Sequence, residues 1–247
     1  MDNLQPSDRL IFPLDVPDAR SAETLANKLG EAVGVFKVGL ELFVREGPSV
    51  LDRIRSAAPK SKLFLDLKFH DIPATVRGAF RSACELGVEF VTVHCDEGER
   101  LLATVAEENR GRTRILAVTV LTSLDTNDLT NLGFRSEFQN DPGKLVLLRA
   151  GMAQRAGCAG VVCSGIEAAR VKKALGNDLI VVTPGIRPAW SVINQDDQKR
   201  ITTPADAIQN GADYIVVGRP IRDAEDPKAA AEKVGDEIRY ALERANH

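Results

Sequence analysis

Eight short, continuously apolar segments recur along the 247-residue chain, and helix-like stretches separate them. The segments are rich in β-branched residues. Their hydrophobicity is continuous rather than alternating, which is typical of strands covered on both faces in a parallel sheet. The segments are LIFPLDV (10–16), VFKVGL (35–40), LFLDLKF (63–69), FVTVHC (90–95), RILAVTVL (114–121), GVVCS (160–164), LIVVTPG (179–185) and YIVVGRP (214–220).

The stretches between these segments have the residue pattern of helices. Three of them are SAETLANKLGEAV (21–33), which opens with Ser21, TVRGAFRSACELG (75–87), which ends on Gly87, and the amphipathic PKAAAEKVGDEIRYALERA (227–245). Eight strand–helix units in a chain of this length predict an α/β fold of the (β/α)8 TIM-barrel type, and a doubly wound open sheet is the alternative. The longest irregular part, 123–143, is expected to hold a loop and a helix outside the barrel.

Composition and charge narrow the class of protein. Hydrophobic residues make up 44% and charged residues 27%, which is ordinary for a globular protein, and we expect residues 1–247 to form a single barrel domain. The net charge of −3 and the lack of a basic block argue against nucleic acid as the main partner. No apolar run is long enough to cross a membrane, and no signal-peptide pattern opens the chain, so we expect a cytoplasmic protein without a membrane span.

Cysteines and histidines are few. They are Cys84, Cys95, Cys158, Cys163, His70, His94 and His247. No C-x-x-C pair occurs, so a structural zinc site is not expected, and the cysteines are interpreted as small buried hydrophobic residues in a reducing compartment. No metal-ligand spacing links the histidines to the aspartates, and we expect structural roles for His70 and His94 and no metal.

Charged side chains stand in the apolar segments near the ends where a barrel has its active site. Asp66 and Lys68 are two residues apart, so a regular strand points both into the barrel. A structural ion pair is one interpretation, because an unpaired buried ion costs several kcal/mol. Asp15 and Lys37 occupy comparable points of the first two segments. Four alternating charges on one rim favour a functional array, since apolar replacement of buried ion pairs is often neutral or stabilising.

The chemistry that suits such an array is proton transfer or decarboxylation. No G-x-S-x-G, G-x-G-x-x-G or Walker pattern occurs, so acyl transfer and the usual dinucleotide or ATP sites have no support. A lysine held between carboxylates stays protonated, and it can donate a proton and stabilise a developing carbanion. A Schiff-base lysine would need a lowered pKa instead, which neighbouring aspartates oppose.

The last two apolar segments end in a glycine followed closely by an arginine, in TPGIRP (183–188) and VVGRP (216–220). Barrels often bind phosphate in the loops after strands seven and eight. Gly218 allows backbone N–H groups to approach an anion, and Arg219 offers bidentate contacts. A surface turn with a solvated arginine is the alternative. We expect a phosphate site here.

Together these motifs closely resemble those of the orotidine 5′-phosphate decarboxylase family, in its shorter bacterial type, over essentially the whole chain from Leu10 onward. The central stretch DLKFHDIPATV matches the signature D-x-K-x-x-D-I-P-x-T at Asp66, Lys68, Asp71, Ile72, Pro73 and Thr75. Further matches are PLDV (Asp15), FKVG (Lys37), VTVH (His94), VTVLTS (Thr122), VTPGIRP (Arg187), DQKR (Gln198) and VGRPI (Gly218, Arg219).

The resemblance implies a barrel of the ribulose-phosphate-binding type and a cofactor-free decarboxylation of orotidine 5′-phosphate to UMP in pyrimidine biosynthesis. In this interpretation Lys68 protonates C6 and Asp66 presses against the substrate carboxylate. Lys37 and Asp71 complete the charge network. The resemblance also implies a homodimer with composite active sites, in which Asp71 and Thr75 act across the interface.

Substrate-binding positions also follow from the resemblance. They are Asp15 and Lys37 for the ribose, Asp66, Asp71, Ile72 and Thr75 from the signature, Thr122 with Ser123 for the pyrimidine edge, and Arg187, Gln198, Gly218 and Arg219 for the phosphate. Gln195 is the alternative to Gln198, because the loop after Arg187 is longer than the family pattern. Trp190 is expected to pack within this loop.

Two other functions stay open. A Mg²⁺-dependent sugar-phosphate decarboxylase or hexulose-phosphate synthase also carries a D-x-K-x-x-D motif, although the HDIPATV and DQKR stretches favour the nucleotide enzyme. A non-catalytic nucleotide-binding barrel would be expected to have a degraded charge set, and here the set is complete.

Overall fold

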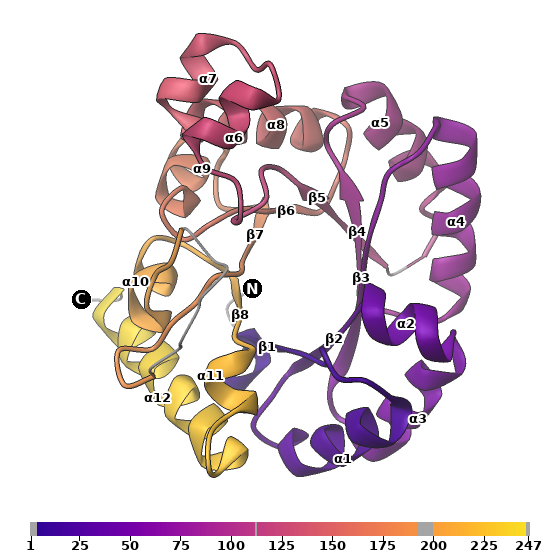
Figure 1. The fold of residues 1–247 in the computed structure, drawn as a ribbon, viewed down its shortest axis with the longest axis vertical. Helices are drawn as coiled ribbons and strands as arrows, with labels where there is room; N and C mark the ends of the chain where they lie inside the picture. Colours follow the sequence, from indigo (N-terminus) through magenta and orange to yellow (C-terminus); the bar gives the residue numbers. More distant parts are fainter. Residues whose placement is uncertain (1–3, 112, 192–199, 246–247) are drawn as a thin grey trace.

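The computed structural model describes residues 4–111, 113–191 and 200–245, and the eight strands in these ranges close into a barrel in sequence order (Figure 1). Every neighbouring pair is parallel, including β8 with β1. The predicted (β/α)8 barrel is therefore confirmed over the doubly wound sheet. The strands are β1 (Leu10–Pro13), β2 (Val35–Gly39), β3 (Lys62–Phe69), β4 (Phe90–His94), β5 (Arg114–Val118), β6 (Gly160–Val162), β7 (Ile180–Thr183) and β8 (Tyr214–Val216).

Helices surround the barrel (Figure 1). They are η1 (Pro6–Arg9), α1 (Ala19–Leu29), α2 (Leu40–Glu46), α3 (Ser49–Ala57), α4 (Pro73–Glu85), α5 (Glu99–Glu108), α6 (Thr126–Asn131), α7 (Ser136–Asn140), α8 (Pro142–Arg155), α9 (Ala168–Leu175), α10 (Pro204–Gln209), α11 (Arg219–Arg222) and α12 (Pro227–Ala245). The irregular part after β5 holds two short helices, α6 and α7, where one helix was expected. Among the described helices, none combines the length and the apolar character needed to span a membrane.

Local chemistry explains where the helices begin and end. The expectation that the first helix opens at Ser21 was wrong, because α1 begins at Ala19 and ends at Leu29. Its N-cap is Asp18, whose carboxylate accepts a hydrogen bond of 2.8 Å from the backbone N–H of Ser21. The predicted stop at Gly87 is confirmed, since α4 ends just before this glycine, which takes a left-handed φ of 65°.

Several strands end earlier than the apolar segments that predicted them. The ladder of β5 stops at Val118 and that of β8 at Val216, whereas the apolar runs continue to positions 121 and 220. Apolar residues directly beyond the ladders remain buried, as Val120 and Val217 illustrate. The apolar segments therefore predict which residues are buried, but they do not predict where strand pairing ends.

Two apolar clusters stabilise the fold. The larger lies between the barrel and its helices, and the smaller fills the barrel with Ile11, Val35, Phe64, Phe90, Leu116, Ile180, Val182 and Tyr214. In the inner cluster the ring of Phe90 makes edge contacts with Phe64 and Tyr214, at centroid distances of 5.8 and 5.2 Å. Side chains alternate along a strand, so residues two positions after Val35, Phe64 and Phe90 also face inward, nearer the carboxyl ends of the strands.

Candidate active site

A cavity of about 480 Å³ lies at the carboxyl ends of the strands. Its walls come from residues in or after β1, β2, β3, β5, β6, β7 and β8. Of the residues predicted for the site, those that line the cavity are Asp15, Lys37, Asp66, Lys68, Thr122, Ser123, Arg187, Gly218 and Arg219. The barrel topology thus brings most of the predicted set together.

One wall of the cavity carries a row of alternating charges. The Nζ of Lys37 lies 3.5 Å from Oδ1 of Asp15 and 3.2 Å from Oδ2 of Asp66. The Nζ of Lys68 lies 2.9 Å from the same Oδ2 of Asp66. Exposure grows outward from the centre of the row, from 10% for the Asp66 side chain and 12% for Lys37 to 32% for Lys68 and 51% for Asp15.

Mutual attraction keeps the two most buried members of the row charged. Burial lowers the pKa of Lys37, but the negative charges of Asp66 and Asp15 outweigh this effect, so its pKa is raised above the usual value. Burial likewise raises the pKa of Asp66, and the positive charges of Lys37 and Lys68 outweigh it, so its pKa is lowered. At neutral pH, Lys37 is an ammonium and Asp66 a carboxylate.

The backbone of Lys68 is not that of a regular strand. Its φ of 50° makes it the one non-glycine residue with a positive φ in the described part of the chain. Pairing between β3 and β4 is interrupted between Leu65 and Phe69. The expectation that both Asp66 and Lys68 face into the barrel is confirmed, since both line the cavity. Regular strand alternation is not the reason for Lys68, because an irregularity of the β-bulge kind brings its side chain to Asp66. Such strained residues are concentrated at functional sites.

The wall of the cavity that follows β7 and β8 carries arginines beside a glycine that cannot be replaced without a clash. A Cβ on Gly218 would lie 2.9 Å from Cγ of Pro13, so only glycine fits between β8 and α11. Arg219 follows at the start of α11. Arg187 follows β7, and its backbone N–H donates a hydrogen bond of 2.8 Å to the carbonyl oxygen of Thr202. This side of the cavity is suited to an anion.

Three residues of the signature motif do not reach this cavity within one chain. Asp71, Ile72 and Thr75 are exposed and are absent from its described lining. The carboxylate of Asp71 accepts a hydrogen bond of 2.6 Å from the backbone N–H of Ile72. The expectation that Asp71 joins the row of charges is therefore not met by the residues of a single chain.

Of the residues predicted in the loop after β7, the structure describes Trp190 but not the two glutamines. Gln198 and its alternative Gln195 lie outside the described residues. Trp190 packs against α12 and not within its own loop, where it was expected, and it does not line the described part of the cavity. Its Nε1–H donates a hydrogen bond of 2.7 Å to Glu237, and Lys233 lies 4.7 Å from its ring centroid.

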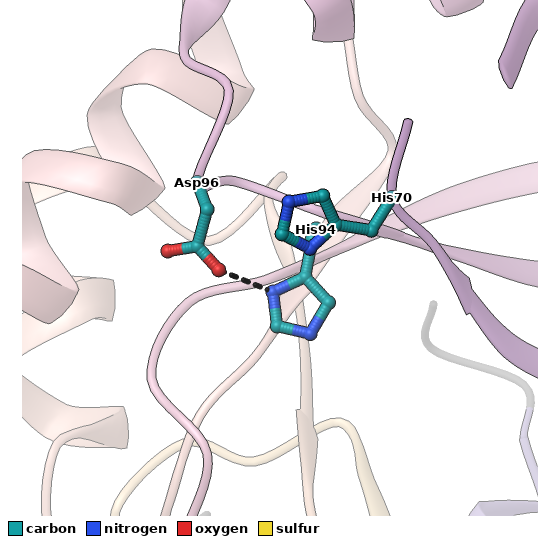
Figure 2. A group of neighbouring side chains, drawn as sticks. All are labelled: His70, His94 and Asp96. Carbon is teal, nitrogen blue, oxygen red and sulfur yellow. Dashed lines mark ion pairs between the residues drawn. The ribbon is translucent and has the colours of Figure 1, made fainter. Parts of the chain in front are cut away.

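Beside the cavity the fold gathers His70, His94 and Asp96 (Figure 2). Donor atoms of the three lie within 4.8 Å of one another, a proximity that spacing in the sequence did not indicate. The Nδ1 of His94 is 2.8 Å from Asp96, which also pairs with Arg149, and His70 pairs with Glu97. The pKa of Asp96 is lowered, first by its close contact with His94 and then, against burial, by the charge of Arg149. The three donor atoms are close enough to hold a metal ion, so the structural roles expected for both histidines stay a prediction.

Sequence reasoning missed three polar residues around the cavity. Arg222 lines it, one helical turn after Arg219. Thr92 contacts Asp66, although a threonine within an apolar segment is indistinguishable from an ordinary strand residue. Arg200 donates hydrogen bonds of 3.0 and 2.9 Å to the carbonyl oxygens of residues 120 and 121, directly before Thr122. Its place in the DQKR motif was the one signal available.

The cysteines offer no nucleophile at the cavity. All four are free thiols. Cys163 lines the cavity, but burial raises its pKa well above the usual value. Burial also raises the pKa values of Cys95 and Cys158 to about 12. The raised pKa values of these three thiols disfavour a thiolate at neutral pH.

Comparison with known proteins places this site in a family. The pattern of the "Orotidine 5'-phosphate decarboxylase / HUMPS family" matches residues 8–234. Two curated relatives named orotidine 5'-phosphate decarboxylase come from Desulfosudis oleivorans and Methylococcus capsulatus. The first is 46% identical and covers 96% of this chain and 95% of the relative. The second is 48% identical and covers 94% and 93%.

Solved structures give the same result. A crystal structure of orotidine 5'-phosphate decarboxylase from Lactobacillus acidophilus is 35% identical, with a TM-score of 0.79, over 93% of this chain and 98% of that one. The family match and the two relatives span almost the whole length of the barrel. The chain belongs to the orotidine 5'-phosphate decarboxylase / HUMPS family.

Proposed function

We propose that this chain decarboxylates orotidine 5′-phosphate to UMP in de novo pyrimidine biosynthesis, without a cofactor. The observation that carries the proposal is the row of alternating charges formed by Asp15, Lys37, Asp66 and Lys68 on one wall of the cavity. The names of the relatives, at 46 and 48% identity over nearly the whole chain, support the same activity.

The reaction needs what this row offers. When the bond between C6 and the carboxylate breaks, the electron pair stays on C6, CO₂ leaves, and no conjugated group accepts the charge. A fixed ammonium beside C6 stabilises that charge electrostatically as it develops, and we assign this role to Lys68. The same ammonium then transfers a proton to C6 and regains one from solvent.

Asp66 has a separate role in the proposal. Its carboxylate remains ionised between two ammonium groups, so a substrate carboxylate placed beside it is repelled. The repulsion disappears once neutral CO₂ forms, so it destabilises the bound substrate relative to the transition state. Lys37 holds Asp66 in place through the same Oδ2 that Lys68 contacts.

The remaining residues of the cavity are assigned to parts of the nucleotide. Arginine suits phosphate because its planar guanidinium makes bidentate contacts. Binding energy from the phosphate, remote from C6, can offset strain at the reacting carbon. We assign Arg187, Gly218 and Arg219 to the phosphate, together with Gln198, Thr122 and Ser123 to the pyrimidine edge, and Asp15 and Lys37 to the ribose.

We further propose a cytoplasmic homodimer with composite active sites. Asp71, Ile72 and Thr75 are exposed just after β3, on the same end of the barrel as the cavity. Ile72 is 66% exposed, and α2, which follows the neighbouring β2, exposes Leu40 and Val44 at 55% and 79%. Apolar residues exposed to this extent on one end are suited to contact with a second copy. Asp71 and Thr75 would then enter the partner's cavity.

The decisive test is a direct assay of the purified protein with orotidine 5′-phosphate after treatment with EDTA. We expect release of CO₂ and formation of UMP at an unchanged rate, and no reaction with keto-sugar phosphates in the presence of Mg²⁺. Turnover of a keto-sugar phosphate that EDTA abolishes would instead identify the magnesium-dependent alternative. Binding of the nucleotide without any turnover would indicate a non-catalytic barrel.

A further inference from the structure

Thr92 is fully buried at the bulge that shapes the row of charges. It lies on β4 two residues after Phe90, a member of the inner apolar cluster, so its side chain also faces into the barrel. Where pairing between β3 and β4 is interrupted, residues 66–68 of β3 stand opposite this single threonine. Thr92 therefore occupies the gap left by the bulge.

The hydroxyl of Thr92 makes two hydrogen bonds to the catalytic strand. Its O–H donates to Oδ1 of Asp66 at 2.9 Å. Its oxygen accepts from the backbone N–H of Lys68, also at 2.9 Å. The direction of the first bond is fixed, because an ionised carboxylate can only accept.

These two bonds act on different parts of the charge row. The bond to Asp66 occupies Oδ1 and leaves Oδ2 for the ammonium groups of Lys37 and Lys68. The bond to the N–H of Lys68 satisfies a backbone donor in the stretch where the bulge interrupts strand pairing, next to a left-handed φ of 50°. One hydroxyl thus sets both the carboxylate rotation and the backbone that carries the proton donor.

We infer that Thr92 is a positioning residue for the reaction, which it aligns through Asp66 and Lys68 without touching the substrate. The effect on turnover rests on the function proposed above, whereas the effect on geometry does not. Displacing a reacting group by about 1 Å can lower the rate about 100-fold, so loss of the hydroxyl acts mainly on kcat.

Two substitutions separate the hydroxyl from the space it fills. Thr92→Val keeps the shape and removes both hydrogen bonds, leaving a buried carboxylate oxygen and a buried N–H without their partner. Thr92→Ser keeps the hydroxyl and loses one methyl group. If Thr92 had only a structural role, Thr92→Val and Thr92→Ser would have similar effects on kcat.

A matched control exists at the other end of the barrel. Thr113 is also a buried threonine, and its hydroxyl donates one hydrogen bond of 2.9 Å to the carbonyl oxygen of Val88. It precedes β5, so it lies at the end opposite the cavity. Thr113→Val removes a buried hydroxyl without touching the charge row, and we expect its kcat to remain unchanged.

The test combines steady-state kinetics with orotidine 5′-phosphate and crystal structures of the two Thr92 variants. We expect kcat to fall about 100-fold in Thr92→Val with KM changed less than about threefold, and to recover in Thr92→Ser to within about tenfold of wild type. In the structures, the contact of 2.9 Å between Lys68 Nζ and Asp66 Oδ2 persists in Thr92→Ser and is lost in Thr92→Val.

Each remaining outcome overturns one specific claim. A Thr92→Val enzyme with kcat within threefold of wild type and an unmoved Lys68 would overturn the positioning role. The same follows if Thr92→Val, Thr92→Ser and Thr113→Val lose kcat equally, because that pattern reports stability alone. If the wild-type protein does not act on orotidine 5′-phosphate, the proposed function fails, and the crystal structures still decide whether Thr92 places Lys68.

Discussion

Lys68 places its Nζ 2.9 Å from Oδ2 of Asp66 from a backbone that no other described non-glycine residue adopts, with a φ of 50°. Left-handed backbone is unfavourable for a lysine by about 1–2 kcal/mol, and a residue in a regular strand avoids it. The chain retains this conformation at the point where an ammonium group meets the cavity. The relationship indicates that placement of the ammonium, rather than stability, determines the local backbone.

Replacing Lys68 by alanine tests its proposed role directly. Because the substitution removes both the proton donor and the charge that stabilises the carbanion, we expect turnover of orotidine 5′-phosphate to fall by about 10⁴-fold or more. Circular dichroism and the unfolding midpoint should stay close to wild type. Lys60→Ala, which changes an exposed lysine just before β3, is the control and should keep full activity. Substantial residual decarboxylation in Lys68→Ala would contradict the mechanism.

Because of the backbone strain at position 68, we expect glycine to be more stabilising than alanine there, the reverse of the usual order in a strand. Glycine is less favourable than alanine in a normal strand, but at a φ of 50° it avoids the penalty that a Cβ brings. Lys68→Gly should therefore be more stable than Lys68→Ala by about 1 kcal/mol, measured by urea unfolding of both inactive variants. An alanine variant as stable as the glycine variant would mean that the bulge relaxes once the lysine is gone.

Most of the site could be predicted because a parallel barrel brings the ends of all its strands to one side. Asp15, Lys37 and Arg187 lie in or just after different apolar segments, and the predicted barrel topology brings them to one cavity, whereas Thr122 was predicted from the family resemblance. The helix boundaries were less predictable. The N-cap of α1 is Asp18, but Ser21 is an equally favourable N-cap residue, so residue type alone does not decide between them.

What escaped prediction depends on side-chain geometry rather than on topology. Thr92 sits in an apolar segment where threonine is a common strand residue, and its bonds to Asp66 and Lys68 exist only because β3 bulges there. The sequence does not indicate the bulge, because the left-handed backbone conformation is adopted by Lys68 and not by a glycine. Asp71 also lies outside the described lining of the cavity in its own chain.

The buried pair formed by Lys37 and Asp66 predicts how stability depends on pH. Asp66 has a lowered pKa, so its contribution is present above its ordinary value of 3.8 and is lost as the pH falls through the folded value. Lys37 has a raised pKa, so its contribution is present below 10.5 and is lost as the pH rises through the folded value. Stability from the pair should be constant from roughly pH 5 to 9.

Asp66→Asn should remove this contribution. We expect the free energy of unfolding near pH 7 to fall by about 3 kcal/mol, because the change leaves the largely buried Lys37 and the half-buried Lys68 beside a neutral amide. The loss of stability on acidification should also become shallower. Guanidinium unfolding at several pH values measures both effects. Asp236→Asn, at an exposed pair with Arg239, is the control, and an equal effect there would rule out the buried pair as the cause.

Arg187 and Arg219 should contribute mainly to recognition of the phosphate. Changing either to alanine is expected to raise KM for orotidine 5′-phosphate by about 10- to 100-fold, the effect of removing a charge-assisted bidentate contact. The slow reaction of orotidine, which lacks the phosphate, should be nearly unaffected. The exposed Arg239→Ala on α12 serves as the control. Equal losses for both substrates would assign these arginines to the fold instead of the phosphate.

Mixing two inactive variants tests whether active sites are composite. In a heterodimer of Lys68→Ala with Asp71→Ala, one site carries both changes, and the other combines an intact Lys68 with the partner's intact Asp71. Random pairing makes half of the dimers mixed, so about one quarter of wild-type activity should return. Mixing Lys68→Ala with Asp66→Asn is the control. Both of these residues serve the cavity of their own chain, so every site stays damaged and no activity should return. Mixed dimers that form, as judged by differently tagged chains, yet remain inactive would place Asp71 outside the partner's site.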